Sequence, residues 1–152
     1  MASVIPLDTK YYPSDFMVHT SNLGTMAAPI LLMYFDKTVV IDSIVLTVPD
    51  NPTTTAPDVR IVKVSAATPA THAGVTGQSD VTTAVNCPIS AGSYPLTKSW
   101  NNLTSTGFAA TSSTDARGNV VEAGSYLWYV PSISVTGVTG PASVMTRWRS
   151  QF

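Results

Sequence analysis

The segment PILLMYFDKTVVIDSIVLTVP, residues 29–49, decides the fold class of this chain. It holds two apolar runs that are joined at Asp36, Lys37 and Thr38. The second run, residues 39–48, is rich in Val and Ile, whose branched side chains fit a pleated strand better than a helix. Both of its alternating faces are largely apolar, which predicts a strand that is covered on both sides. The segment therefore predicts β-structure at the centre of the fold.

Length and composition extend this prediction to the whole chain. The 152 residues suit a single domain, and only 11% of them are charged, against about 25% in ordinary globular domains. Thr, Ser and Val are abundant instead, and together with Gly and Pro they make the mixture that many short strands joined by tight turns require. The same mixture is typical of a surface that is partly hidden in an assembly, and a neutral all-β domain would explain it equally well.

The charge and the terminal sequence exclude several classes of partner. With a net charge of −1, the chain has no field that would attract nucleic acid or an anionic membrane. No apolar run approaches the roughly 18 residues of a membrane span, and the first residues lack the pattern of a secretory signal. The single cysteine, Cys87, cannot form an internal disulfide and is expected to be a small buried hydrophobe. We therefore expect neither nucleic acid nor membrane as a partner, and folding in a reducing cytoplasm.

Upstream of the central segment, residues 1–28 are expected to form an extended, irregular arm. This stretch carries Pro6 and Pro13 and the aromatic residues Tyr11, Tyr12 and Phe16, without a clear periodic pattern. A short strand fits residues 16–20. Such an arm packs either on its own domain or on a neighbouring subunit, and the sequence leaves both possibilities open.

Downstream, the chain is expected to add short strands to a single domain that spans residues 29–152. Residues 79–88 fit either a short helix capped by Ser79 and Asp80 or a strand. About eight strands without helical crossovers predict an all-β fold, an antiparallel two-sheet sandwich, with jelly-roll topology favoured. The further strands are predicted at residues 59–66, 93–100, 125–131, 133–138 and 143–152.

Motifs that carry chemistry are not found in the sequence. His19 and His72 have no second ligand at metal spacing, and no Cys-x-x-Cys or Asp-rich calcium loop occurs. The chain also lacks a nucleophile elbow, a P-loop and a dinucleotide-binding glycine pattern. We therefore expect no enzyme activity, no metal and no cofactor.

Aromatic residues form two groups that deserve separate interpretations. Tyr126, Trp128 and Tyr129 crowd one predicted strand, where a place in the core is favoured over an exposed ligand-binding row. Residues 147–152, RWRSQF, combine arginines with large aromatics, which are enriched in interface hot spots. An edge strand with solvated arginines and an inward Trp148 explains this second group equally well. The candidate interface residues are Tyr11, Tyr12, Phe16, Arg147, Trp148, Arg149 and Phe152.

Several stretches together resemble the decoration (cement) proteins of tailed bacteriophage capsids. These are PILLMYFDKTVVIDSIVLTVPDNP, DVRIVKVS, NVVEAGSYLWYVPS and MTRWRSQF, from about residue 29 onward. Decoration proteins of this type are small, cysteine-poor, Thr/Ser-rich β-sandwiches or jelly rolls. The resemblance implies a virion protein made in the host cytoplasm that binds the major capsid protein on the capsid surface as a homo-oligomer, with a trimer favoured. A receptor- or carbohydrate-binding module of a phage tail or spike, and a minor tail or connector protein, are the alternatives.

Overall fold

The computed structural model describes residues 16–52, 56–65, 78–101, 108–109, 118–132, 138 and 141–150. These residues form ten β-strands and one 3₁₀ turn at Ala91–Ser93. The strands are β1 (Phe16–Gly24), β2 (Ile30–Phe35), β3 (Val39–Val48), β4 (Asp58–Val64), β5 (Gln78–Asp80), β6 (Val85–Asn86), β7 (Leu96–Asn101), β8 (Val120–Val121), β9 (Ser125–Pro131) and β10 (Ala142–Ser150).

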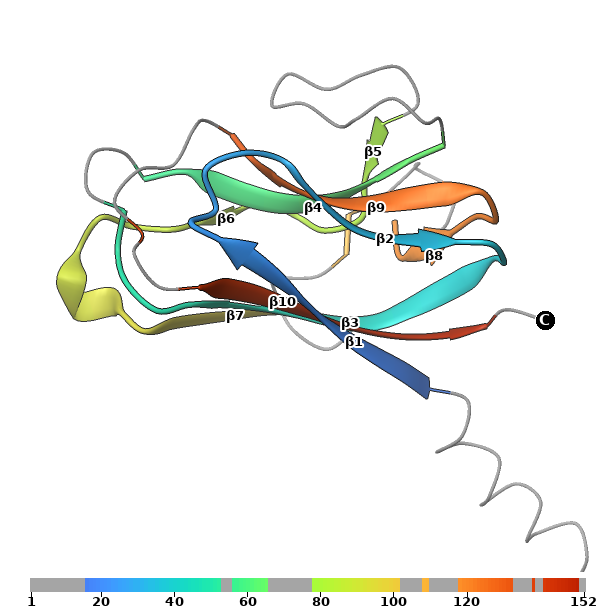
Figure 1. Cartoon of the computed structure of the whole chain (residues 1–152), viewed down its shortest axis with the longest axis horizontal. Helices are drawn as coiled ribbons and strands as arrows, with labels where there is room; N and C mark the ends of the chain where they lie inside the picture. The colour runs from blue at the N-terminus through green and yellow to red at the C-terminus, as the bar shows by residue number, and fades with distance from the viewer. Residues whose placement is uncertain are drawn as a thin grey trace, which may run out of the picture.

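The strands form two antiparallel sheets that lie face to face as two layers (Figure 1). The first sheet has the order β1-β10-β3-β7, with β8 beside β3, and the second has the order β2-β9-β4-β5, with β6 beside β4. Leaving β6 and β8 aside, successive strands alternate between the sheets except at β4 and β5, which are neighbours. This connectivity, with four strands in each sheet, is that of a jelly roll. The predicted all-β, two-sheet sandwich is confirmed.

The core lies between the two sheets and is almost entirely apolar. The central strand β3 contributes five fully or nearly fully buried side chains, and β7 and β9 add the large aromatics Trp100 and Tyr129. Both aromatics keep a hydrogen bond, because Trp100 Nε1 donates to the Thr83 carbonyl at 2.8 Å and the Tyr129 hydroxyl donates to the Met26 carbonyl at 3.4 Å. Large rings whose polar atoms are satisfied can be buried at little cost.

A bulge in β3 corrects the prediction that this strand is covered on both sides. Opposite β3, Arg147 pairs with Ser43 and Trp148 pairs with Ile41, so Asp42 is an extra residue without a partner on β10. A bulge of this kind reverses the alternation of the strand. The core therefore receives Val39 and Ile41 before the bulge, and Ile44, Leu46 and Val48 after it, while Val40, Val45 and Thr47 are half-buried or exposed.

The bulge is held by the turn before β8. The Ile41 amide donates to the Asn119 carbonyl at 2.8 Å, and the Asn119 side-chain amide donates back to the Ile41 carbonyl at 3.0 Å. Next to Asn119, Gly118 bonds to the Ala109 carbonyl, and a Cβ at Gly118 would collide with the Asp80 carbonyl oxygen. Glycine is needed at this position because the backbones approach closely.

Other segments differ from the predictions in extent or type. Phe16–Gly24 forms a full strand of the first sheet, whereas an irregular arm with at most a short strand was expected up to residue 28. Gln78–Asp80 and Val85–Asn86 are strands, so the strand alternative holds for this stretch rather than the helix. Residues 1–15 and 151–152 lie outside the described residues, as does the strand predicted at 133–138.

Cys87 is buried, as predicted. Burial raises the pKa of its thiol to about 11, an effect that Lys98 partly opposes. Because the thiolate is the reactive form, this cysteine is an inert packing residue at neutral pH.

Candidate interaction surface

The first sheet turns one face to the core and the other away from it, and we call the second its outer face. The register between β1, β10 and β3 places the outward side chains in rows across the sheet. Val18 and Met145 are 58% and 38% exposed, respectively. The outer face consists of Phe16, Val18 and Thr20 of β1, Ser143, Met145, Arg147 and Arg149 of β10, Val40, Val45 and Thr47 of β3, and Thr97 and Ser99 of β7.

Phe16 and two arginines form a cluster at one end of the outer face. The guanidinium carbon of Arg147 lies 4.0 Å from the centre of the Phe16 ring, and that of Arg149 lies 6.0 Å from it. Arg147 also forms an ion pair with Asp42, the bulge residue of β3, at 3.3 Å. Cations over an aromatic face are attracted by its quadrupole. The structure thus brings together three of the predicted interface residues.

Trp148 points the other way, because it alternates with Arg147 and Arg149 along β10. It is half-buried, packs against the core, and meets the Phe35 ring edge-on at a centroid distance of 5.4 Å. The inward Trp148 of the edge-strand interpretation is therefore correct, but β10 is not an edge strand, since it lies between β1 and β3. The predicted interface residues Tyr11, Tyr12 and Phe152 lie outside the described residues.

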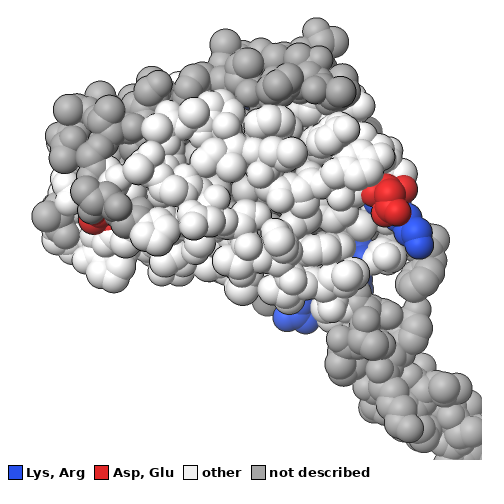
Figure 2. Space-filling view, viewed as in Figure 1, with Lys and Arg blue, Asp and Glu red and all other residues white. Residues whose placement is uncertain are grey.

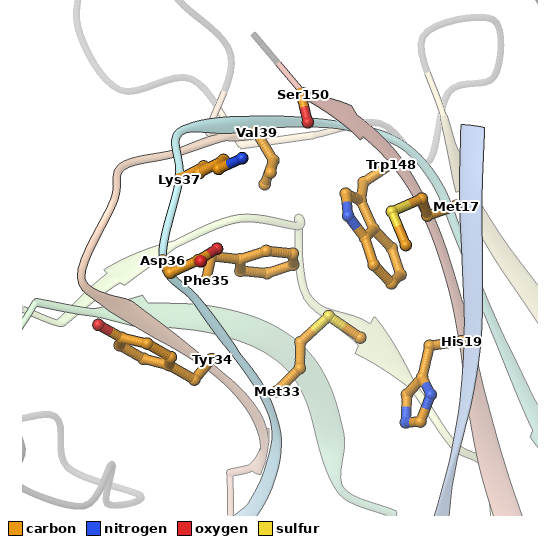
Figure 3. Close-up of a pocket in the computed structure, with 10 residues that line it drawn as sticks. All are labelled: Met17, His19, Met33, Tyr34, Phe35, Asp36, Lys37, Val39, Trp148 and Ser150. Carbon is orange, nitrogen blue, oxygen red and sulfur yellow. The ribbon is translucent and has the colours of Figure 1, made fainter. Parts of the chain in front are cut away.

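Trp148 lines a cavity of about 390 Å³ where β1 and β2, the edge strands of the two sheets, come together. We call this cavity the edge pocket. Figure 3 shows Met17, Met33, Phe35 and Trp148 converging on one space, beside the turn that carries Asp36 and Lys37. Val39, His19, Tyr34 and Ser150 complete the lining. The sequence analysis did not identify this pocket, whose residues come from distant parts of the chain.

The second sheet has a different outer face, which contains its own small core. Val62, Val64 and Val130 are fully buried there, and Trp128 packs against them. Tyr126 lies on the same side as Trp128 and contacts the Tyr34 ring at a centroid distance of 4.9 Å. Of the three aromatics predicted to be core residues in this strand, only Tyr129 lies between the sheets.

Charged groups are few among the described residues, and some of them form ion pairs. Lys63, whose side chain is 13% exposed, donates to the Val120 carbonyl at 2.6 Å and forms an ion pair with Glu122 at 2.9 Å. Burial alone would raise the pKa of Glu122, but hydrogen bonds and the charge of Lys63 outweigh it, so this pKa lies below its usual value. Within the described ranges, no three His, Cys, Asp or Glu residues come together as metal ligands.

Figure 2 shows how sparse these charges are on the face in view, where Lys, Arg, Asp and Glu lie toward the margins. A surface with so few charges exerts little long-range electrostatic attraction on other molecules. Among the helices in the described part of the chain, none is long and apolar enough to cross a membrane.

No protein-family model matches this sequence, and no curated protein or solved structure matches it significantly. A functional assignment therefore depends on the jelly-roll fold, on the outer face of the first sheet and on the edge pocket. The outer face has the composition of an interface, and the edge pocket has the composition of a site for an apolar group.

Proposed function

We propose that this protein is a structural virion protein: a decoration protein that binds the outer surface of a bacteriophage capsid and stabilises contacts between capsid subunits. The observation that carries the proposal is the outer face of the first sheet, where Phe16 lies beside Arg147 and Arg149 and where Val18 and Met145 are exposed. The jelly-roll sandwich agrees with the resemblance to decoration proteins described above.

The chemistry of this face suits a second protein surface. Arginine and aromatic residues are enriched in interfaces, where each supplies apolar area together with directional contacts. Around the Phe16 cluster, the exposed threonines Thr20, Thr47 and Thr97 offer hydroxyls that donate or accept hydrogen bonds without the desolvation cost of a charge. A sheet face with these groups can dock on a folded partner without rearranging its own backbone.

The partner is then the major capsid protein in its assembled form. A protein that binds the shell but not free subunits stabilises the shell by mass action. A symmetric homo-oligomer, with a trimer favoured, presents several copies of the same face to a symmetric lattice. The protein acts at the capsid surface of the virion after synthesis in the host cytoplasm.

Two matched substitutions in the full-length chain test the proposal. Val18→Lys places a charge on the outer face of the first sheet, and Leu31→Lys places the same charge on β2 of the second sheet, at a residue that is 47% exposed. Co-sedimentation with assembled shells of the phage that carries the gene measures binding. We expect Val18→Lys to weaken binding at least ten-fold and Leu31→Lys to change it less than two-fold. Equal binding by both variants and the parent chain, or no binding by the parent chain, contradicts the proposal.

One observation favours a second candidate function, a receptor- or carbohydrate-binding module of a phage tail or spike. The edge pocket combines the aromatic rings of Trp148 and Phe35 with the polar groups of His19, Asp36 and Lys37, a mixture found in small-ligand sites. A glycan array with the full-length chain tests this candidate. Specific binding that Trp148→Ala abolishes supports it, and an array without signal removes it.

A further inference from the structure

The edge pocket brings together three side chains that carry nitrogen or sulfur donor atoms. Met17 and His19 lie two residues apart on β1 and therefore face the same side of the sheet, where Trp148 of β10 stands opposite Met17. Met33 comes from β2, the edge strand of the other sheet, and its side chain extends toward β1 (Figure 3). The fold thereby places one imidazole and two thioethers around a single space.

This set of donor atoms has a definite metal preference. Thioether sulfur is a soft ligand that suits Cu(I), and imidazole also binds copper. Mg²⁺ and Ca²⁺ take oxygen ligands instead, and Zn²⁺ takes thiolate, imidazole and carboxylate. Cu(I) has a filled d shell, as Zn²⁺ has, and such ions impose no geometric preference of their own. Methionine is unbranched and has three rotatable bonds, so its sulfur can adjust to an ion between two strands.

We propose that the edge pocket binds one Cu(I) ion through the Sδ atoms of Met17 and Met33 and an imidazole nitrogen of His19, with the ring of Trp148 beside the ion. Cations are attracted to the face of an aromatic ring, and most strongly to that of tryptophan. The ion binds without any change in its oxidation state. Copper binding at this pocket goes beyond the proposed function and does not depend on it.

The surroundings of the three ligands suit a singly charged ion. Asp36 and Lys37 carry opposite charges and lie on the side of the pocket away from His19 (Figure 3). Together they add no net charge to the site, and the Asp36 carboxylate is not placed beside the imidazole as a second ligand for Zn²⁺. The cavity of about 390 Å³ has room for the ion. Met17 is 57% exposed, which gives Cu(I) a path of entry from solvent.

Titration of the full-length protein with Cu(I), buffered by a competing chelator without oxygen, measures the affinity. Met33→Leu removes one sulfur and keeps a side chain of similar volume, so it preserves the packing. The matched control is Met145→Leu, which makes the same change at a 38% exposed methionine on the outer face of the first sheet. We expect Met33→Leu to weaken Cu(I) binding at least ten-fold and Met145→Leu to change it less than two-fold. Equal affinities in the two variants, or no binding by the parent chain, overturn the proposal.

Two further measurements separate this site from other ways of holding copper. Cys87 is the single cysteine of the chain, and it is buried with the pKa of its thiol raised to about 11. Cys87→Ala should therefore change the Cu(I) affinity less than two-fold. Ag(I), a soft ion that is not readily oxidised, should displace Cu(I), whereas an equal concentration of Zn²⁺ should not. Loss of binding in Cys87→Ala, or displacement by Zn²⁺, contradicts a site made of two thioethers and one imidazole.

X-ray absorption at the copper edge identifies the ligands directly. We expect two sulfur ligands and one nitrogen ligand in the parent chain, and one sulfur ligand in Met17→Leu. Cu(I) should also quench the tryptophan fluorescence of the parent chain but not that of Trp148→Phe, because Trp100 and Trp128 lie in the core and on the outer face of the second sheet. Copper bound by nitrogen and oxygen alone, or equal quenching in the two proteins, would place the ion outside the edge pocket.

Discussion

The two sheets of this sandwich share one core, but their outer faces differ. On the second sheet, Val62, Val64 and Val130 are fully buried on the side away from the core. On the first sheet, the corresponding side carries the exposed residues Val18 and Met145 and the half-buried Val45. Both faces contain apolar residues, but the second buries three of its valines completely and leaves Leu31 and Tyr34 of β2 exposed at its edge.

This difference separates residues that hold the fold from residues that are available to a partner. A valine at zero exposure already contributes its full transfer free energy to folding. An apolar residue that remains half exposed, such as Met145, has area left to bury against another molecule. The outer face of the first sheet therefore offers apolar area that can be buried against a partner without loss of stability.

The largest expected change in the free energy of unfolding comes from a charge on the outer face of the second sheet, compared with the same charge on the first. Val62→Asp buries an unpaired carboxylate in the second sheet and should lower the free energy of unfolding by more than about 4 kcal/mol. Val45→Asp, on the first sheet, leaves its carboxylate in contact with water and should cost about 1 kcal/mol. Urea unfolding measures both changes. If the two variants are equally stable, the two outer faces do not differ as described.

A second pair of substitutions separates the two sides of β10. Trp148→Ala removes a half-buried ring that packs on Phe35, and it should cost about 3 kcal/mol. Arg149→Ala removes an exposed side chain of the outer face and should change stability by less than about 0.5 kcal/mol. Thermal unfolding measures the stabilities, and shell binding should show the reverse order, with Arg149→Ala the more defective. A stability loss of similar size in both variants would mean that the outer face is structural.

The smallest expected effect is a pH dependence of stability that comes from Glu122, the partner of Lys63. Because the pKa of Glu122 is lowered in the folded protein, its contribution is fully present above the usual value of 4.5 and is lost as the pH falls through the lowered value. Glu122→Gln should remove this contribution, about 1 kcal/mol or less because the carboxylate is well exposed. Asp42→Asn, in the bulge of β3, should cost still less. Unfolding curves between pH 7 and roughly pH 3 measure the stability that each variant loses. A larger loss for Asp42→Asn than for Glu122→Gln contradicts the prediction.

Local patterns in the sequence predicted the sandwich well. Residues 39–48 and 125–131 are strands as expected, because runs of β-branched and aromatic residues determine strand formation locally. The bulge at Asp42 could not be predicted, since it exists only in the register with β10. The full length of β1 was missed for the same reason, because its pairing partner lies at the other end of the chain.

The candidate site was predictable only where its composition is unusual. Phe16, Arg147 and Arg149 were predicted because aromatic and arginine residues are typical of interfaces, and the structure brings them together. Trp148 was assigned to the same group, but alternation along β10 sends it to the opposite face. The edge pocket requires β1, β2 and β10 to meet, and no local pattern contains that information.

Radical footprinting of the full-length protein, free and bound to assembled shells, tests the central claim most directly. Met145 and Tyr34 are exposed in the free chain on the outer faces of the first and the second sheet, at 38% and 52%. We predict that shell binding lowers the oxidation of Met145 at least five-fold, because contact at a docking interface excludes water and radicals, and leaves Tyr34 unchanged. Protection of Tyr34 with unchanged oxidation of Met145 would contradict the assignment of the first sheet as the docking face.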